Sequence, residues 1–332
     1  MEKPKRRQRY RGKNPRHFSE KYKEHEPERY VADVARVVDR GRTPAGMHRP
    51  IMVREVMEVL APKAGEFAVD CTLGYGGHAA ALLAAIQPGG RLIGVDIDPI
   101  ELPKTESRLR KLGFGTDVFT VQRSNFAGLA RLLPEPADVV FADLGVSSMQ
   151  MDNPERGFTY KYEGPLDLRM NPERGQPAGA LLARLDAPAL AALLIENADE
   201  PNADRIARAI LQAPVSTTTE LAAVVRSAGG DDDAIRRVFQ ALRIAVNDEF
   251  GALDEFLRSL PLCLKAGGRA AVLSFHSGED RRVKKAFQSG EREGVYSEIA
   301  HEIVRPSPEE LRANPRSHSA KLRWARARME QL

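Results

Sequence analysis

Short runs of apolar residues alternate with longer helical patterns over most of the chain. The short runs lie at residues 67–69, 91–95, 118–121, 138–142 and 269–275, and they predict five strands. The stretches that separate the first three runs predict helices, at residues 78–86 and 100–112. Strands that alternate with helices are typical of an α/β fold built on a parallel sheet.

A block of alanine- and leucine-rich segments separates the fourth predicted strand from the fifth. Residues 178–227 predict four helices, and residues 238–260 predict one long amphipathic helix after them. Beyond the fifth strand, residues 295–304 and 320–328 predict a closing antiparallel strand pair. The expected architecture is therefore a parallel sheet that ends in an antiparallel pair and carries a helical insertion.

A glycine-rich turn joins the first predicted strand to the helix that follows it. Gly74, Gly76 and Gly77 lie between Asp70 and that helix. Glycines let the backbone pass close to a ligand, and the N-terminus of the helix presents unpaired N–H groups. The second strand ends in Asp96, where an acid can bind the two ribose hydroxyls of a nucleoside. The sequence therefore predicts a nucleotide-type binding site.

The spacing of the glycines and the acid before them indicate the ligand. Dinucleotide sites usually carry G-x-G-x-x-G and bind a pyrophosphate, whereas this turn reads G-x-G-G-H. The acid Asp70 suits a cation better than it suits phosphates. S-adenosylmethionine, which carries a sulfonium and an ammonium group, is therefore the expected cofactor. The alternatives are a dinucleotide and a turn that serves only the fold.

Polar residues follow the other predicted strands, and parallel strands deliver such residues to a ligand crevice. Asp143 follows the fourth strand and is the first candidate for chemistry, with a helix cap as the alternative. Phe126 follows the third strand, where adenine is usually bound, and its alternative is a place in the core. Ser274 and His276 end the fifth strand and are expected to point to the same side, with a structural histidine as the alternative.

Charge and composition indicate a class of partner and a compartment. The net charge is +4, and residues 1–16 carry eight lysines and arginines with one glutamate. The basic tail, residues 1–40, is expected to be disordered and is either an RNA-binding segment or a solvated leader. Both cysteines lie in apolar surroundings, and no apolar run approaches the length of a membrane span. We expect a soluble, cytoplasmic protein.

Motifs along nearly the whole chain resemble one family closely. They include HRPIMVREV from His48, DCTLGYGGH from Asp70, FADLGVSSMQMDNPERGF from Phe141 and SFHSGEDRRVK from Ser274. The family is the bacterial small-subunit ribosomal RNA methyltransferase H family, also called MraW. The resemblance implies transfer of a methyl group from S-adenosylmethionine to the exocyclic N4 of a decoding-region cytidine. It also implies that 16S rRNA, within the small ribosomal subunit, is the partner.

The resemblance assigns residues to the site, and the sequence pattern divides the chain into parts. The positions that bind the methyl donor in the family correspond here to Gly76, Gly77, His78, Asp96, Phe126, Asp143 and Gln150. We expect a Rossmann-like class I methyltransferase domain at residues 41–148 and 236–332, with residues 149–235 as an inserted, mainly helical substrate-recognition domain. In that insertion Arg205 and Arg208 share one helix face and either face solvent or contact RNA.

The catalytic residues are harder to predict. Other amino-methyltransferases carry a polar residue, two prolines and an aromatic after the fourth strand, and this chain has Asp143-Leu144-Gly145-Val146 there. Because cytosine N4 is a poor nucleophile, it needs a hydrogen-bond acceptor, and the candidates are Asp143 first and then His276 with Ser274. No metal is expected. The alternatives are a methyltransferase that acts on DNA or protein and a catalytically silent ribosome-assembly or RNA-binding factor. The sequence leaves the oligomeric state open, a homodimer included.

Overall fold

The computed structural model describes residues 50–329. The basic tail at residues 1–40, and His48 and Arg49 of the first family motif, lie outside the described residues. The described residues belong to one compact unit. None of their helices has both the length and the apolar character that crossing a bilayer requires.

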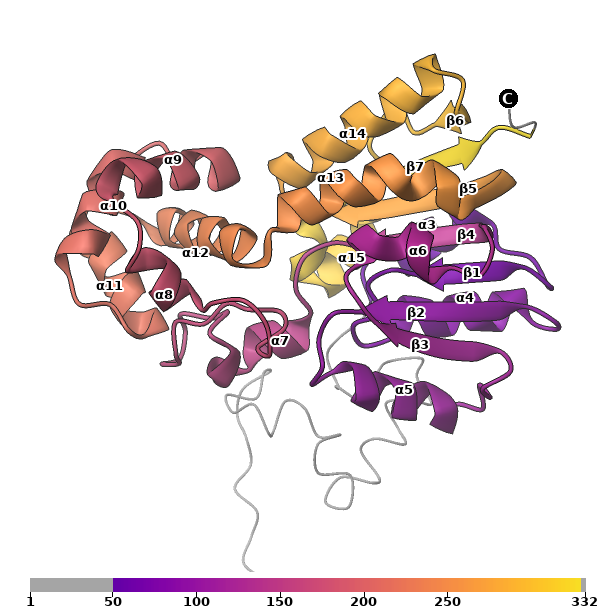
Figure 1. The fold of residues 1–332 in the computed structure, drawn as a ribbon, viewed down its shortest axis with the longest axis horizontal. Helices are drawn as coiled ribbons and strands as arrows, with labels where there is room; N and C mark the ends of the chain where they lie inside the picture. The colour runs from indigo at the N-terminus through magenta and orange to yellow at the C-terminus, as the bar shows by residue number, and fades with distance from the viewer. Residues whose placement is uncertain (1–49, 330–332) are drawn as a thin grey trace, which may run out of the picture. The chain divides into compact units, whose positions relative to one another are not determined.

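Seven strands form one sheet in the order β3-β2-β1-β4-β5-β7-β6 (Figure 1). The five strands from β3 to β5 are parallel, and β7 pairs antiparallel with both β5 and β6. The strands are β1 (Phe67–Asp70), β2 (Arg91–Asp96), β3 (Phe119–Arg123), β4 (Ala137–Asp143), β5 (Leu264–Ser274), β6 (Tyr296–Ile299) and β7 (Lys321–Ala327). This order confirms the predicted strands, the closing antiparallel pair and the Rossmann-like class I methyltransferase sheet.

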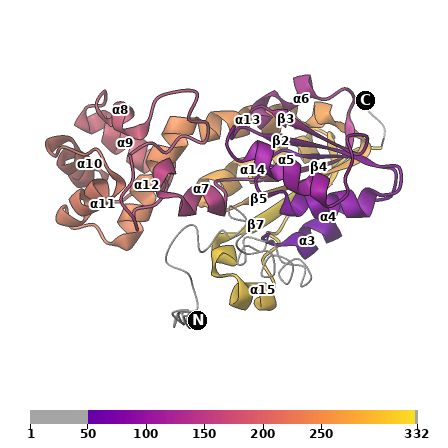
Figure 2. The same ribbon diagram turned by 90° about the horizontal axis from the view of Figure 1, so that it is seen from below.

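Helices cover both faces of the sheet, because its central parallel strands are apolar on both sides. All four residues of β1 are buried, for example. The helices of one layer are α3 (Val53–Leu60), α4 (Gly77–Ile86) and α5 (Leu102–Lys111), and those of the other are α6 (Leu129–Leu132), α13 (Glu249–Ser259) and α14 (Ser277–Arg292). Figure 2 shows α3 and α6 on opposite sides of the strands.

Five further helices gather around a core of their own (Figure 1). They are α8 (Ala178–Leu182), α9 (Ala187–Ala198), α10 (Ala203–Gln212), α11 (Thr218–Ser227) and α12 (Asp232–Asn247). Leu190, Ile206 and Leu242 are fully buried in this core. The four helices predicted at residues 178–227 are confirmed. The predicted domain boundary at residue 236 falls inside α12, whose buried residues pack in the helical core. The division into separate domains stays a prediction.

The single long helix predicted at residues 238–260 is wrong, because the chain forms α12 and α13 with a break between them. Asp248 joins the two helices in the left-handed conformation, with φ 48° and ψ 46°. Aspartate and asparagine tolerate this conformation better than most residues. At the break, the side chain of Asn247 accepts a hydrogen bond from Met170 N (2.7 Å) and donates one to Leu168 O (2.7 Å). These contacts come from distant residues, so the apolar spacing of the sequence did not reveal the break.

Candidate functional site

Three carboxylates lie at the C-terminal ends of neighbouring parallel strands. Asp96 ends β2, Asp70 ends β1 and Asp143 ends β4, and these strands are adjacent in the sheet. Asp96 Oδ2 accepts a hydrogen bond from Gly74 N (2.7 Å), and its Oδ1 accepts one from Asp98 N (2.9 Å). Each carboxylate oxygen keeps a second lone pair for a ligand. The three acids predicted for the crevice therefore lie together at the expected edge of the sheet.

Burial raises the pKa of all three acids. It raises the pKa of Asp70 to about 7, and the nearby charge of Asp96 adds to the shift. Burial likewise raises the pKa of Asp96 to about 6, against the lowering effect of its backbone hydrogen bonds. The pKa of Asp143 lies well above its usual range because of burial and the charges of Asp70 and Glu279. A cationic ligand would relieve this repulsion, so the cluster fits a sulfonium or ammonium group.

The glycine turn is held from both sides. Gly76 precedes α4 with φ 80°, a conformation that favours glycine. A Cβ on Gly77 would overlap the ring of Pro50. From α5, Thr105 Oγ1 donates to Gly74 O (2.5 Å) and Arg108 Nη2 donates to Tyr75 O (2.8 Å). The turn therefore has a fixed backbone, and the first N–H groups of α4 have no intrahelical acceptor.

His78 lies in the first turn of α4 and faces Asp143. Its Nε2 lies 2.9 Å from Ile51 O, and because a carbonyl only accepts, Nε2 carries the hydrogen. Burial lowers the pKa of His78 to about 4, so the ring is neutral and Nδ1 keeps its lone pair. Nδ1 lies 3.7 Å from Asp143 Oδ2. The imidazole therefore lies beside Asp143 without a hydrogen bond between the two side chains.

Asp143 has one oxygen without a protein partner. Its Oδ1 is buried and makes no hydrogen bond with any group in residues 50–329. The backbone N of Asp143 donates to Thr72 Oγ1 (2.6 Å), which fixes the end of β4. The side chain as a whole is 29% exposed, so it borders the crevice. A buried acceptor without a partner is costly unless a ligand supplies the donor.

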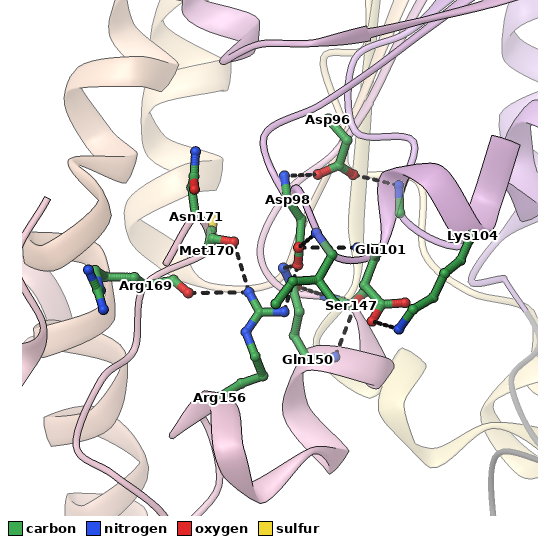
Figure 3. Close-up of polar contacts among 12 residues, drawn as sticks. Asp96, Asp98, Glu101, Lys104, Ser147, Gln150, Arg156, Arg169, Met170 and Asn171 are labelled. Atoms are coloured by element: carbon green, nitrogen blue, oxygen red, sulfur yellow. Dashed lines mark hydrogen bonds and ion pairs between the residues drawn. The ribbon is translucent and has the colours of Figure 1, made fainter. Parts of the chain in front are cut away.

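The amide of Gln150 is used within the protein. Gln150 lies in α7 (Ser148–Asp152), and its Oε1 accepts from Ser147 N (2.8 Å). Its Nε2 donates to Asp98 Oδ2 (2.7 Å), as Figure 3 shows. The Ser-x-x-Gln spacing of a capping box was visible in the sequence and predicts the first of these contacts. A direct contact of Gln150 with the methyl donor stays a prediction.

Sequence reasoning missed a buried ion pair beneath this site. Arg156 Nη1 lies 2.8 Å from Asp98 Oδ2, and the two side chains are 6% and 1% exposed. Arg156 Nη2 also donates to Met170 O (2.8 Å), so the guanidinium lies between the loop after β2 and the segment that leads to α8 (Figure 3). The only sequence signal was the second acid of the run Val95-Asp96-Ile97-Asp98.

Ser274 and His276 have structural partners. Ser274 Oγ donates to Lys321 O of β7 (3.3 Å), and Ser274 is 1% exposed. His276 caps α14: its Nδ1 accepts from Glu279 N (3.4 Å), and its Nε2 lies 3.1 Å from Glu279 Oε1. The charge of Glu279 reaches Asp143 and raises its pKa. A catalytic role for Ser274 or His276 stays a prediction.

Phe126 lies in the short 3₁₀ turn η2 (Phe126–Gly128) after β3. Its ring packs edge-on against Phe256 of α13, with 5.4 Å between centroids. The aromatic ring is partly buried, and it packs against the sheet core. Its contact with adenine stays a prediction. Within the described part of the chain, no three histidine, cysteine, aspartate or glutamate side chains form a group that could hold a metal ion.

Comparison with known proteins gives the family. The MraW methylase family matches residues 45–328. The chain is 51% identical to "Ribosomal RNA small subunit methyltransferase H 2" of Alkaliphilus metalliredigens, over 98% of each chain. It is 46% identical to "Ribosomal RNA small subunit methyltransferase H 1" of Lachnoclostridium phytofermentans, over 97% of this chain and 92% of that one. The chain therefore belongs to the MraW methylase family, and its methyl donor is S-adenosylmethionine, as the acidic crevice predicts.

Proposed function

We propose that this protein methylates the exocyclic N4 of a cytidine in the decoding region of 16S rRNA. The names of its relatives support an RNA of the small ribosomal subunit as substrate. The cytidine and its N4 atom come from the resemblance of the sequence motifs. Helices α8 to α12, which we call the helical group, lie between β4 and β5, and we assign them to substrate recognition.

The residues of the acidic crevice fit the methyl donor. When bound, S-adenosylmethionine supplies an electrophilic methyl group on a positively charged sulfur. Asp96 would hold the ribose hydroxyls with the lone pairs that its backbone hydrogen bonds leave free. The donor would lie against the backbone at the start of α4, formed by Gly76, Gly77 and His78. A side chain on Gly77 has no room there. Phe126 and Gln150 complete the set that the resemblance implies.

Asp143 is the residue that we assign to the amine. The lone pair of cytosine N4 is delocalised into the ring, so the attacking nitrogen needs an acceptor for one of its hydrogens as it becomes pyramidal. The positive charge of a bound donor would lower the raised pKa of Asp143 and so favour its ionised form. Oδ1 would then accept the hydrogen bond from N4, and later the proton that N4 loses. The observation that carries this assignment is the buried Oδ1 without a partner in the described residues.

The test is Asp143→Asn, which keeps the shape of the side chain and removes its basicity. We expect methyl transfer at saturating donor to fall by about 100-fold or more, the usual contribution of a general base. The matched control is Asp138→Asn, which removes a carboxylate from the other end of β4, where Asp138 pairs with Lys265. Near wild-type turnover in Asp143→Asn would remove Asp143 from the mechanism.

A separate measurement tests the target atom. Nucleoside mass spectrometry of a methylated decoding-region RNA should give N4-methylcytidine at one position. A methyl group on C5 or on a ribose, with the same donor consumption, would contradict the proposed substrate. Equilibrium binding of labelled donor separates an enzyme from a silent RNA-binding factor, because only the enzyme needs the donor.

A further inference from the structure

A basic hollow lies on the helical group, away from the residues assigned to the methyl donor. It has a volume of about 540 Å³. Arg205, Arg208 and Gln212 line it from α10, and Ser227 and Gly229 line it from the end of α11. No acidic side chain lines it. The opposite face of α10 packs in the core through residues such as Ile206 and Ile210, so the two arginines have a fixed helix beneath them.

Arg205 and Arg208 differ from the other arginines of α10, α11 and α12. The other four each pair with a carboxylate: Arg226 with Asp232, Arg236 with Asp233, Arg237 with Glu200 and Arg243 with Glu249. Within residues 50–329, neither Arg205 nor Arg208 has a hydrogen-bond or ion-pair partner, and both are exposed. Two exposed guanidinium groups on one helix face, with no acid between them, carry positive charge that no carboxylate of the described residues neutralises.

Arg205 lies against the turn after α11. Gly229 adopts φ 78°, and a Cβ there would lie 3.2 Å from both Nη1 and Nη2 of Arg205. The absence of a side chain at Gly229 therefore lets the guanidinium lie against the turn. Two of the carbonyls that end α11 already accept hydrogen bonds, since Gly229 N donates to Arg226 O and Gly230 N donates to Val225 O. Since Arg205 has no partner within residues 50–329, its N–H groups are open to an acceptor outside the described chain.

We propose that Arg205 and Arg208 bind backbone phosphates of the substrate RNA. This inference rests on the proposed function. Guanidinium groups match phosphate oxygens in geometry as well as in charge. Residues three apart on a helix are neighbours, so the pair can contact one phosphate together or two phosphates in sequence. The Gln212 amide and the Ser227 hydroxyl add neutral groups at the same hollow. Such contacts would hold the RNA without reading its sequence.

The test compares two double variants with the same loss of charge. Arg205→Gln/Arg208→Gln removes the unpaired arginines, and the matched control Arg226→Gln/Arg236→Gln removes two arginines that have carboxylate partners. The affinity for a decoding-region RNA fragment is measured against salt concentration in the full-length protein. Each lost phosphate contact lowers the slope of log affinity against log salt by about 0.7 to 0.9. We expect the first variant to lose about 0.7 to 0.9 of the wild-type slope if the pair shares one phosphate, or about 1.4 to 1.8 if each arginine binds its own, and the control to keep the slope.

The outcomes separate this inference from the proposed function. An unchanged slope in Arg205→Gln/Arg208→Gln, or an equal loss in the control, would overturn the phosphate site. Binding of S-adenosylmethionine should be unchanged in both variants, which shows that each remains folded. If the double variant fails that check, the single variants Arg205→Gln and Arg208→Gln each should lose about half of the slope change. Failure of the wild-type protein to form N4-methylcytidine would overturn the proposed function, while a slope loss confined to the first variant would still support the phosphate site.

Discussion

Replacing Arg156 by methionine tests whether the buried ion pair supports the donor site. Arg156→Met keeps a side chain of similar length and removes the charge that faces Asp98 Oδ2 at 2.8 Å. Removing one partner of a buried pair costs about 3–5 kcal/mol, because the other charge stays buried. Asp98 keeps hydrogen bonds from Gln150 Nε2 and from Ile100 N, which favours the lower end of that range. We therefore expect a loss of about 3 kcal/mol in the free energy of unfolding.

Urea-induced unfolding measures this loss, and Arg123→Met is the control. Arg123 pairs with Glu173 at the same distance of 2.8 Å, but the two side chains are 53% and 58% exposed. An exposed pair contributes about 0–1 kcal/mol. Arg156→Met should also weaken donor binding, because Asp98 N holds Asp96 Oδ1 at 2.9 Å. Equal unfolding free energies for Arg156→Met and Arg123→Met would refute the reasoning from burial.

Two further predictions concern the acids and the histidine. In the folded protein the pKa of Asp70 is about 7 and that of Asp96 about 6, both above the usual value of an aspartate. The folded protein without donor therefore holds protons that the unfolded chain releases, and its stability should fall as pH rises from about 4 to 7. The affinity for S-adenosylmethionine, measured by calorimetry, should rise with pH over the upper part of this range, because the acids ionise there. An affinity that stays constant from about pH 5.5 to 8 would contradict a role of these acids in binding the donor. His276→Ala removes the cap of α14 and should lower the thermal stability. If the role of His276 is structural, turnover at saturating donor should stay unchanged. A large loss of turnover at unchanged stability would make His276 catalytic.

The sequence predicted the acidic crevice because that part of the site depends on local pattern. Asp70, Asp96 and Asp143 each follow a short apolar run, and the ends of adjacent parallel strands meet at one edge. Knowing the strands was therefore enough to bring the three acids together. The glycine turn followed in the same way, since its spacing is contained in a few consecutive residues.

The contacts that the sequence did not reveal join residues far apart in the chain. Arg156 lies 58 positions from Asp98, and nothing near either residue indicates the other. Ser274 bonds to Lys321, on a strand whose pairing with β5 the apolar pattern does not specify by register. The Asp248 break was hidden because apolar spacing continues on both sides of it. In each case the deciding partner comes from tertiary packing.

Asn247 has a consequence for how the helical group is attached. The chain enters the group past Leu168 and Met170 and leaves it at the end of α12, and one side-chain amide bonds both crossings together. The same amide donates to Arg243 O, which fixes it to its own helix. The two crossings thus behave as a single joint. Bending one connection alone would break these bonds, so Asn247 couples the entry of the helical group to its exit.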